Sequence, residues 1–158
     1  MEEKDLYQPM RNWLEQYLKE KYKTGEVMVE DTSQIYLEEA LRRQGIEYSI
    51  ANGLKIQIDV LGIVKVKDKV LLFFIEAKKG DLVLKDLGQL LIYSKLIDPE
   101  EAFLMTPVRF GSVGTVINVL RRNELIQYGD GKRIKEIKIV QWDLKAGKPN
   151  WNTIIPKI

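Results

Sequence analysis

Three residues of this chain could together perform phosphodiester chemistry: Asp59, Glu76 and Lys78. Asp59 lies in the alternating segment 54–61, while Glu76 and Lys78 lie at the end of the apolar segment 70–77 and just after it. Ionised carboxylates avoid apolar strands unless a cation or another partner compensates their charge. If the two segments are adjacent strands, Asp59 faces Glu76, and the two carboxylates provide oxygen ligands for a divalent cation. Lys78 projects from the same strand face as Glu76.

The composition restricts the chemistry further. The chain has 158 residues, of which 45% are hydrophobic and 30% charged, as expected for one folded domain. It contains neither histidine nor cysteine, which excludes Ser-His-Asp triads, thiol nucleophiles, zinc–thiolate sites and iron–sulfur clusters. Acid–base or metal chemistry must therefore use carboxylates, lysines and water, with hard cations such as Mg²⁺ or Mn²⁺.

The spacing of apolar residues predicts the elements that position these groups. Helical periodicity indicates helices at 3–22 and 82–97. A further helix is expected at 32–44, with Asp31, Thr32 and Ser33 offering side chains for its N-cap. Pro9 either sits in the first turn of the first helix or kinks it. Strands are expected at 26–29, 54–66, 70–77, 102–105 and 133–142, and a further helix at 112–122. The order of these elements predicts an α/β fold with a mixed central sheet flanked by helices.

With these residues in this order, the chain resembles the PD-(D/E)xK nuclease superfamily, in its RecB-like and archaeal Holliday-junction-resolvase-like branches. The resemblance rests on Asp59, on Glu76-Ala77-Lys78, and on Gln89-Leu-Leu-Ile-Tyr93 in the following helix. It implies a restriction-endonuclease-like core, α-β-β-β-α-β, over residues of about 3–106. Residues 1–158 would form a single domain, with 107–158 adding a C-terminal helix and a basic strand.

The resemblance also implies roles for individual residues. Asp59, Glu76 and Lys78 would be catalytic, Asp59 and Glu76 would bind the metal, and Gln89 and Tyr93 would contact the substrate. The superfamily uses an additional acid from the first helix. Glu3 is the first choice for this acid and Glu15 the second; Glu38 or Glu39 takes the role if 32–45 is the first core helix.

The C-terminal end of the chain is basic. Residues 132–158 carry 7 basic and 2 acidic residues, and two interpretations of them stay open. Lys135 and Lys138 would contact the phosphate backbone of DNA, or they would protect a solvated edge strand. Trp142 and Trp151 lie among these basic residues in the sequence. We favour the interpretation that their rings cover the hydrophobic core over the interpretation that they stack on bases.

The function that these features predict is Mg²⁺- or Mn²⁺-dependent hydrolysis of DNA in repair, recombination or restriction. An inactive nucleic-acid-binding or regulatory domain with the same fold is the alternative. The expected partner is DNA, with branched and single-stranded forms included, and a homodimer stays open. An acidic N-terminus without a leader-like pattern and apolar runs too short to span a bilayer predict a cytoplasmic protein with no membrane partner.

Overall fold

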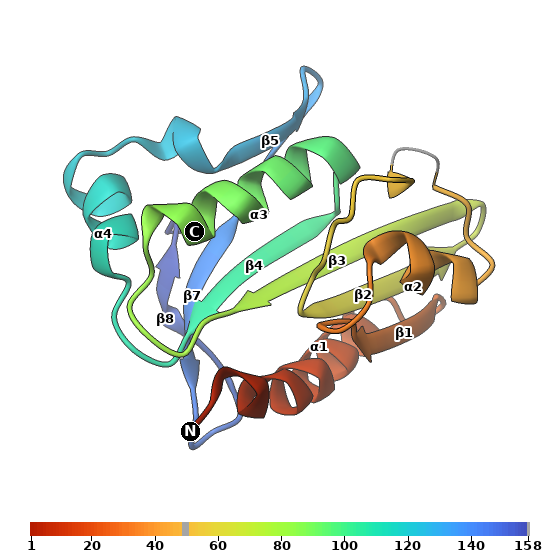
Figure 1. Cartoon of the computed structure of the whole chain (residues 1–158), viewed down its shortest axis with the longest axis horizontal. Coiled ribbons are helices and arrows are strands. Elements are labelled where there is room, and N and C mark those ends of the chain that lie inside the picture. The colour runs from red at the N-terminus through yellow and green to blue at the C-terminus, as the bar shows by residue number, and fades with distance from the viewer. Residues whose placement is uncertain (49–50, 158) are drawn as a thin grey trace.

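The computed structural model describes residues 1–48 and 51–157 (Figure 1). The helices are η1 (Glu3–Leu6), α1 (Tyr7–Lys21), α2 (Leu37–Arg43), α3 (Leu84–Ile97), α4 (Gly111–Gly114), η3 (Thr115–Val119) and η4 (Asn123–Ile126). The strands are β1 (Glu26–Asp31), β2 (Val60–Val66), β3 (Lys69–Ala77), β4 (Glu101–Thr106), β5 (Gln127–Asp130), β6 (Arg133–Glu136), β7 (Lys138–Asp143) and β8 (Lys148–Ile155).

Six strands form one mixed sheet in the order β1-β2-β3-β4-β7-β8. β1, β2 and β3 are antiparallel neighbours, β3, β4 and β7 run parallel, and β8 returns antiparallel to β7. The parallel step from β3 to β4 requires a crossover, which α3 provides. β5 and β6 form a separate two-stranded hairpin. The predicted α/β class with a mixed sheet is therefore confirmed.

The sheet is covered on both faces (Figure 1). Residues of β3 alternate between two hydrophobic clusters: Leu72 and Phe74 pack with residues of α3, whereas Phe73 and Ile75 pack with residues of α1. This alternation follows from the two-residue period of a strand. It also explains why 70–77 is apolar throughout, because a strand covered on both faces has no solvent side.

α1 forms where its apolar spacing predicts. Met10, Leu14 and Leu18 recur every four residues and are fully buried against the sheet. Pro9 lies in the first turn of α1, where a missing N–H costs little.

β2 is shorter than the predicted strand 54–66, because it begins at Val60. Its partner β1 ends at Asp31, which is opposite Val60, so residues before Val60 have no neighbouring strand on that side. Instead, the Ile56 carbonyl accepts a hydrogen bond from the N–H of Leu37, at the start of α2. Asp59 therefore lies immediately before β2 and not within it.

The predicted helix 32–44 is also shorter, and the predicted caps are wrong. α2 begins at Leu37 with Tyr36 as the N-cap. The Asp31 carboxylate accepts hydrogen bonds from the N–H and hydroxyl of Ser33, and the Thr32 hydroxyl donates to the Ile58 carbonyl. These side chains stabilise the turn before the helix, as residues of this type commonly do.

The C-terminal part contains more strands than predicted. The expected single strand 133–142 is divided at Ile137 into β6 and β7, since the N–H of Ile137 bonds the carbonyl of Ile126. β7 and β8 complete the central sheet. Within 107–158, the strands β7 and β8 are therefore part of the main sheet, whereas β5 and β6 form the separate hairpin.

Candidate functional site

Asp59 and Glu76 lie opposite each other at one end of the sheet. β2 and β3 are antiparallel with Val60 opposite Ile75, which brings the residue before Val60 beside the residue after Ile75. The N–H of Asp59 donates to Glu76 Oε1 over 3.4 Å, and the N–H of Ala77 donates to Asp59 Oδ2 over 2.8 Å. Backbone hydrogen bonds thus hold both carboxylates in place.

Lys78 is the cation beside these acids. Its Nζ lies 3.7 Å from Glu76 Oε2, 3.9 Å from Glu3 Oε1 and 3.9 Å from Asp86 Oδ1. The side chain is about one-quarter exposed, so solvent screens these charges only partly. We refer to Glu3, Asp59, Glu76, Lys78 and Asp86 as the carboxylate cluster.

Glu3 is the only one of the four candidate first acids that the described structure brings to this cluster. It lies in η1, directly before α1, and its Oε1 accepts a hydrogen bond from the Tyr7 hydroxyl over 3.3 Å. The other three bind elsewhere: Glu15 pairs with Arg11 and Lys19, Glu38 accepts from the N–H of Gly53, and Glu39 pairs with Arg42 and Arg43.

Sequence reasoning missed Asp86 and Tyr7. Asp86 lies in the first turn of α3, where its carboxylate accepts a hydrogen bond from the N–H of Val83 over 3.0 Å. The sequence did contain a signal for Asp86: it is an acid in the first turn of the predicted helix that closely follows Lys78. Tyr7 follows Glu3 by four residues, the spacing at which helical side chains meet.

Burial and like charge dominate the electrostatics of the cluster. Burial, together with the neighbouring charge of Asp59, raises the pKa of Glu76 to about 8, although Lys78 opposes this rise. Burial likewise raises the pKa of Asp59. Burial alone would lower the pKa of Lys78, but the charges of Glu76, Glu3, Asp86 and Asp59 raise it overall. Four carboxyl groups thus share one ammonium, and burial disfavours the ionised forms of Glu76 and Asp59.

The donor set fits a hard divalent cation. Every candidate ligand is a carboxylate oxygen, the type that Mg²⁺ and Mn²⁺ prefer, and a buried carboxylate pair is stabilised by added positive charge. Over residues 1–48 and 51–157, no three or more Asp, Glu, His or Cys side chains already have metal-binding geometry. Asp59 and Glu76 are the two carboxylates that could hold such a cation, and Glu3 lies beside them at the Lys78 ammonium.

Gln89 and Tyr93 lie on α3, one and two turns beyond Asp86. Gln89 Nε2 donates to the Tyr93 hydroxyl over 3.0 Å. Gln89 is exposed and Tyr93 is half-buried. Both follow Asp86 at helical spacing and border the side of α3 that leads to the carboxylate cluster.

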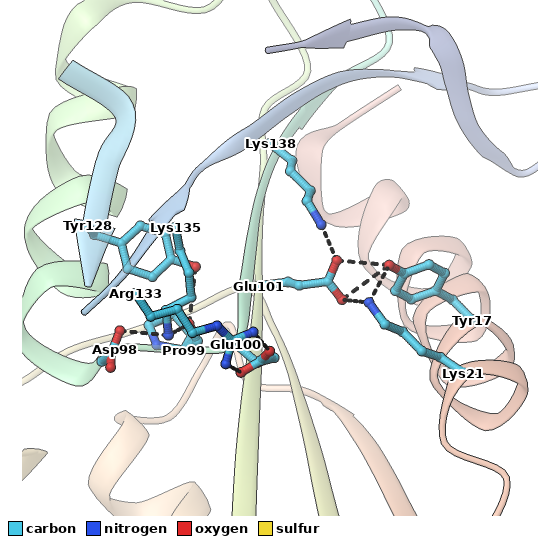
Figure 2. A network of polar contacts seen from close by, with 10 residues as sticks. All are labelled: Tyr17, Lys21, Asp98, Pro99, Glu100, Glu101, Tyr128, Arg133, Lys135 and Lys138. Carbon is cyan, nitrogen blue, oxygen red and sulfur yellow. Dashed lines mark hydrogen bonds and ion pairs between the residues drawn. The ribbon is translucent and has the colours of Figure 1, made fainter. Parts of the chain in front are cut away.

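Lys135 and Lys138 lie elsewhere. Lys138 pairs with Glu101, and Lys135 Nζ lies 2.7 Å from Asp98 Oδ1 (Figure 2). Glu101 begins β4, whereas Glu76 pairs with Leu104 near the other end of that strand. Strand alternation also puts Glu101 on the α1 face and Glu76 on the α3 face. Lys138 therefore lies on the face opposite Glu76, and Lys135, beside Asp98, lies at the other end of α3 from Asp86.

Comparison of the chain with protein-family models, with curated proteins and with solved structures found no match. Among the described residues, no helix has both the length and the apolar character needed to cross a bilayer.

Proposed function

We propose that this chain is a metal-dependent nuclease that hydrolyses phosphodiester bonds of DNA. The observation that carries the proposal is the convergence of Asp59, Glu76 and Lys78, with an excess of carboxylates over cations around them. A restriction-endonuclease-like core is part of the proposal. The order α1, β1, β2, β3, α3, β4 supports it, with α2 inserted between β1 and β2.

Asp59 and Glu76, assisted by Glu3, would hold Mg²⁺ or Mn²⁺. The chemistry that such an ion supplies is polarisation of a phosphate oxygen and a lower pKa of water. The backbone N–H groups of Asp59 and Ala77 orient the two carboxylates. Tyr7 does the same for Glu3 through its hydroxyl.

Lys78 would act on the reacting groups. Carboxylates of Glu3, Glu76 and Asp86 lie around its ammonium at 3.7–3.9 Å, which keeps it charged and limits its motion. From this position the ammonium can orient an attacking water or stabilise negative charge that develops on the phosphate. Because the charge is already in place, little reorganisation is needed during the reaction.

Gln89 and Tyr93 would contact the DNA strand that enters the cluster. The amide of Gln89 is exposed on α3 and is oriented by its hydrogen bond to Tyr93. Amide and phenol groups bind phosphate and sugar oxygens without reading sequence. We include a cytoplasmic location in the proposal.

The test is digestion of labelled linear, branched and single-stranded DNA with Mg²⁺ or Mn²⁺, and with EDTA as the metal-free control. We expect cleavage by the wild-type chain and none by Asp59→Asn or Glu76→Gln, with DNA binding retained. Glu15→Gln is the matched control, because Glu15 is an acid of α1 that lies outside the cluster. Cleavage by Asp59→Asn at the wild-type rate contradicts the proposal, and DNA binding without any cleavage by the wild-type chain favours the inactive alternative.

A further inference from the structure

A second group of functional side chains lies on the α1 face of the sheet, away from the carboxylate cluster. It combines two partly buried aromatic rings of α1 and the more exposed Trp151 ring of β8 with lysines from α1 and β7. We call this group the Trp151 surface. Its members are Trp13, Tyr17, Lys21, Lys138 and Trp151.

The aromatic rings form one contiguous group. The ring centroid of Trp151 lies 5.9 Å from that of Trp13 and 6.3 Å from that of Tyr17, and Trp13 stacks on Tyr17 at 5.0 Å. Trp142 lies beneath them and is 2% exposed, whereas Trp151 is 41% exposed. Hydrophobic cover thus accounts for Trp142, but it leaves a large part of the Trp151 ring open to solvent.

Two lysines are fixed beside these rings. Lys21 Nζ lies 3.1 Å from Glu101 Oε2 and 5.5 Å from the centre of the Tyr17 ring. Lys138 reaches the same carboxylate, and Figure 2 shows the two ammonium groups converging on it. The Glu101 side chain is only 5% exposed, while Lys21 and Lys138 remain 44% and 32% exposed. One buried carboxylate therefore orients two solvent-accessible cations, which leaves a net positive charge.

A cavity of about 420 Å³ continues from these lysines toward the β5–β6 hairpin. Two further cations border it, and each already has a carboxylate partner: Arg133 pairs with Glu100 and Lys135 with Asp98. The charged residues that line the cavity are Lys21, Glu100, Glu101, Arg133, Lys135, Glu136, Lys138 and Lys157. Cations outnumber acids along this wall, so it favours an anionic ligand.

We propose that the Trp151 surface binds single-stranded nucleic acid. One base stacks on the exposed part of the Trp151 ring, and the adjoining phosphates lie against Lys21 and Lys138. Exposed aromatic rings beside a positive groove are the arrangement by which proteins bind single strands without sequence preference. A duplex is disfavoured, because its bases are already paired and stacked. This binding goes beyond the proposed cleavage, since Glu101 and Glu76 lie on opposite faces of the sheet and near opposite ends of β4.

The test measures fluorescence anisotropy of labelled dT12, rU12 and a 12-base-pair duplex with the wild-type chain in EDTA. We expect both single strands to bind more tightly than the duplex. Trp151→Leu keeps the apolar cover but removes the ring, and we expect at least about a tenfold loss of affinity. Lys21→Gln should weaken binding and reduce the slope of log K against log salt by about 0.7, as for one lost phosphate contact.

Lys19→Gln is the matched control, because Lys19 is exposed on the same helix and pairs with Glu15; its affinity should equal that of the wild type. Trp151→Tyr should restore most of the loss, and Lys21→Gln decides the test if Trp151→Leu fails to fold in thermal unfolding. Wild-type affinity in Trp151→Leu or Lys21→Gln overturns the proposal, as does equal competition by polyphosphate of the same length. Because this binding is measured in EDTA, where metal-dependent cleavage does not occur, failure of the cleavage proposal is seen separately in the digestion assay.

Discussion

At the residue scale, the ammonium of Lys78 lies among carboxylates from three different elements. Carboxylate oxygens of Glu3, Glu76 and Asp86 lie 3.7–3.9 Å from it. Its charge is therefore held close to where the proposed reaction would develop negative charge, and its contribution should affect the chemical step more than the docking of DNA.

We therefore expect Lys78→Met to lower the single-turnover cleavage rate by about 10²-fold, comparable to the loss of one electrostatic donor in an active site. DNA affinity, measured in Ca²⁺ to prevent turnover, should change little. Lys79→Met is the control, because Lys79 is the exposed neighbour of Lys78. A wild-type rate in Lys78→Met would show that Glu76-Ala77-Lys78 is not a catalytic motif here.

The surroundings of Glu101 lower its pKa, which makes the stability of the protein depend on pH. Burial by itself would raise its pKa, but Lys138, Lys21 and the Tyr17 hydroxyl together hold the pKa below its usual value. The folded protein therefore keeps Glu101 ionised at a pH where the unfolded chain already takes up a proton. This stabilisation is present above the pKa of the unfolded chain and is lost as pH falls through the lower pKa of the folded state.

Replacement of Glu101 by Gln should lower the free energy of unfolding at pH 7 by about 2 kcal/mol, through lost charged hydrogen bonds. The same variant should lose less stability than the wild type between pH 5 and pH 3. Urea unfolding at both ends of this range measures the difference. Identical pH profiles for Glu101→Gln and the wild type would show that the ion pairs of Glu101 make no net contribution.

At the element scale, two glycines report how closely helices approach the sheet. A Cβ on Gly62 of β2 would lie 2.8 Å from Leu18 Cδ1 and 3.2 Å from Phe73 Cβ, so α1 packs directly over this glycine. A Cβ on Gly88 of α3 would meet nothing within 4 Å. An added side chain should therefore destabilise the protein at Gly62 and be accommodated at Gly88.

We expect Gly62→Val to destabilise the protein by about 1–3 kcal/mol, because added volume in a packed core forces side chains and backbone to move. Gly88→Ala should stabilise it by up to about 1 kcal/mol, because alanine favours the helix and restricts the unfolded chain. Chemical denaturation of both variants tests this contrast. Equal effects would mean that α1 can shift away from β2 without cost.

At the scale of the whole molecule, the carboxylate cluster joins η1, β3, α3 and the residue before β2. Folding brings these carboxyl groups together and buries them, which disfavours their ionised forms unless a cation is present. A divalent ion that binds only the folded protein should therefore stabilise the entire fold.

We expect Mg²⁺ or Mn²⁺ at ten times its dissociation constant to add about 1.4 kcal/mol to the free energy of unfolding, and EDTA to remove this gain. Asp59→Asn and Glu76→Gln should lose the response, whereas Glu15→Gln should keep it. Thermal unfolding at several metal concentrations provides the measurement. A metal response that persists in Glu76→Gln would locate the ion elsewhere.

Much of the fold could be predicted from local pattern. The buried residues Met10, Leu14 and Leu18 of α1 recur at helical spacing, and the apolar segment 70–77 has the character of a strand covered on both faces. Boundaries were less predictable where other groups compete for backbone hydrogen bonds. Thr32 and Leu37 bind the segment before β2, which shortens both the strand and the helix α2.

The sequence by itself determined which chemistry is available. Without histidine or cysteine, any metal site must use carboxylate oxygens, and periodicity alone put Asp59 and Glu76 in successive strand-like segments. Only the tertiary structure decided which other groups join them: it brought Glu3, Tyr7 and Asp86 to the cluster and took Lys138 to Glu101 on the opposite face. The physical reason is the distance along the chain between the residues that interact. Periodicity is a property of neighbouring residues, whereas side chains from distant segments meet only through strand register and helix packing, as Tyr17 meets Glu101 across 84 positions.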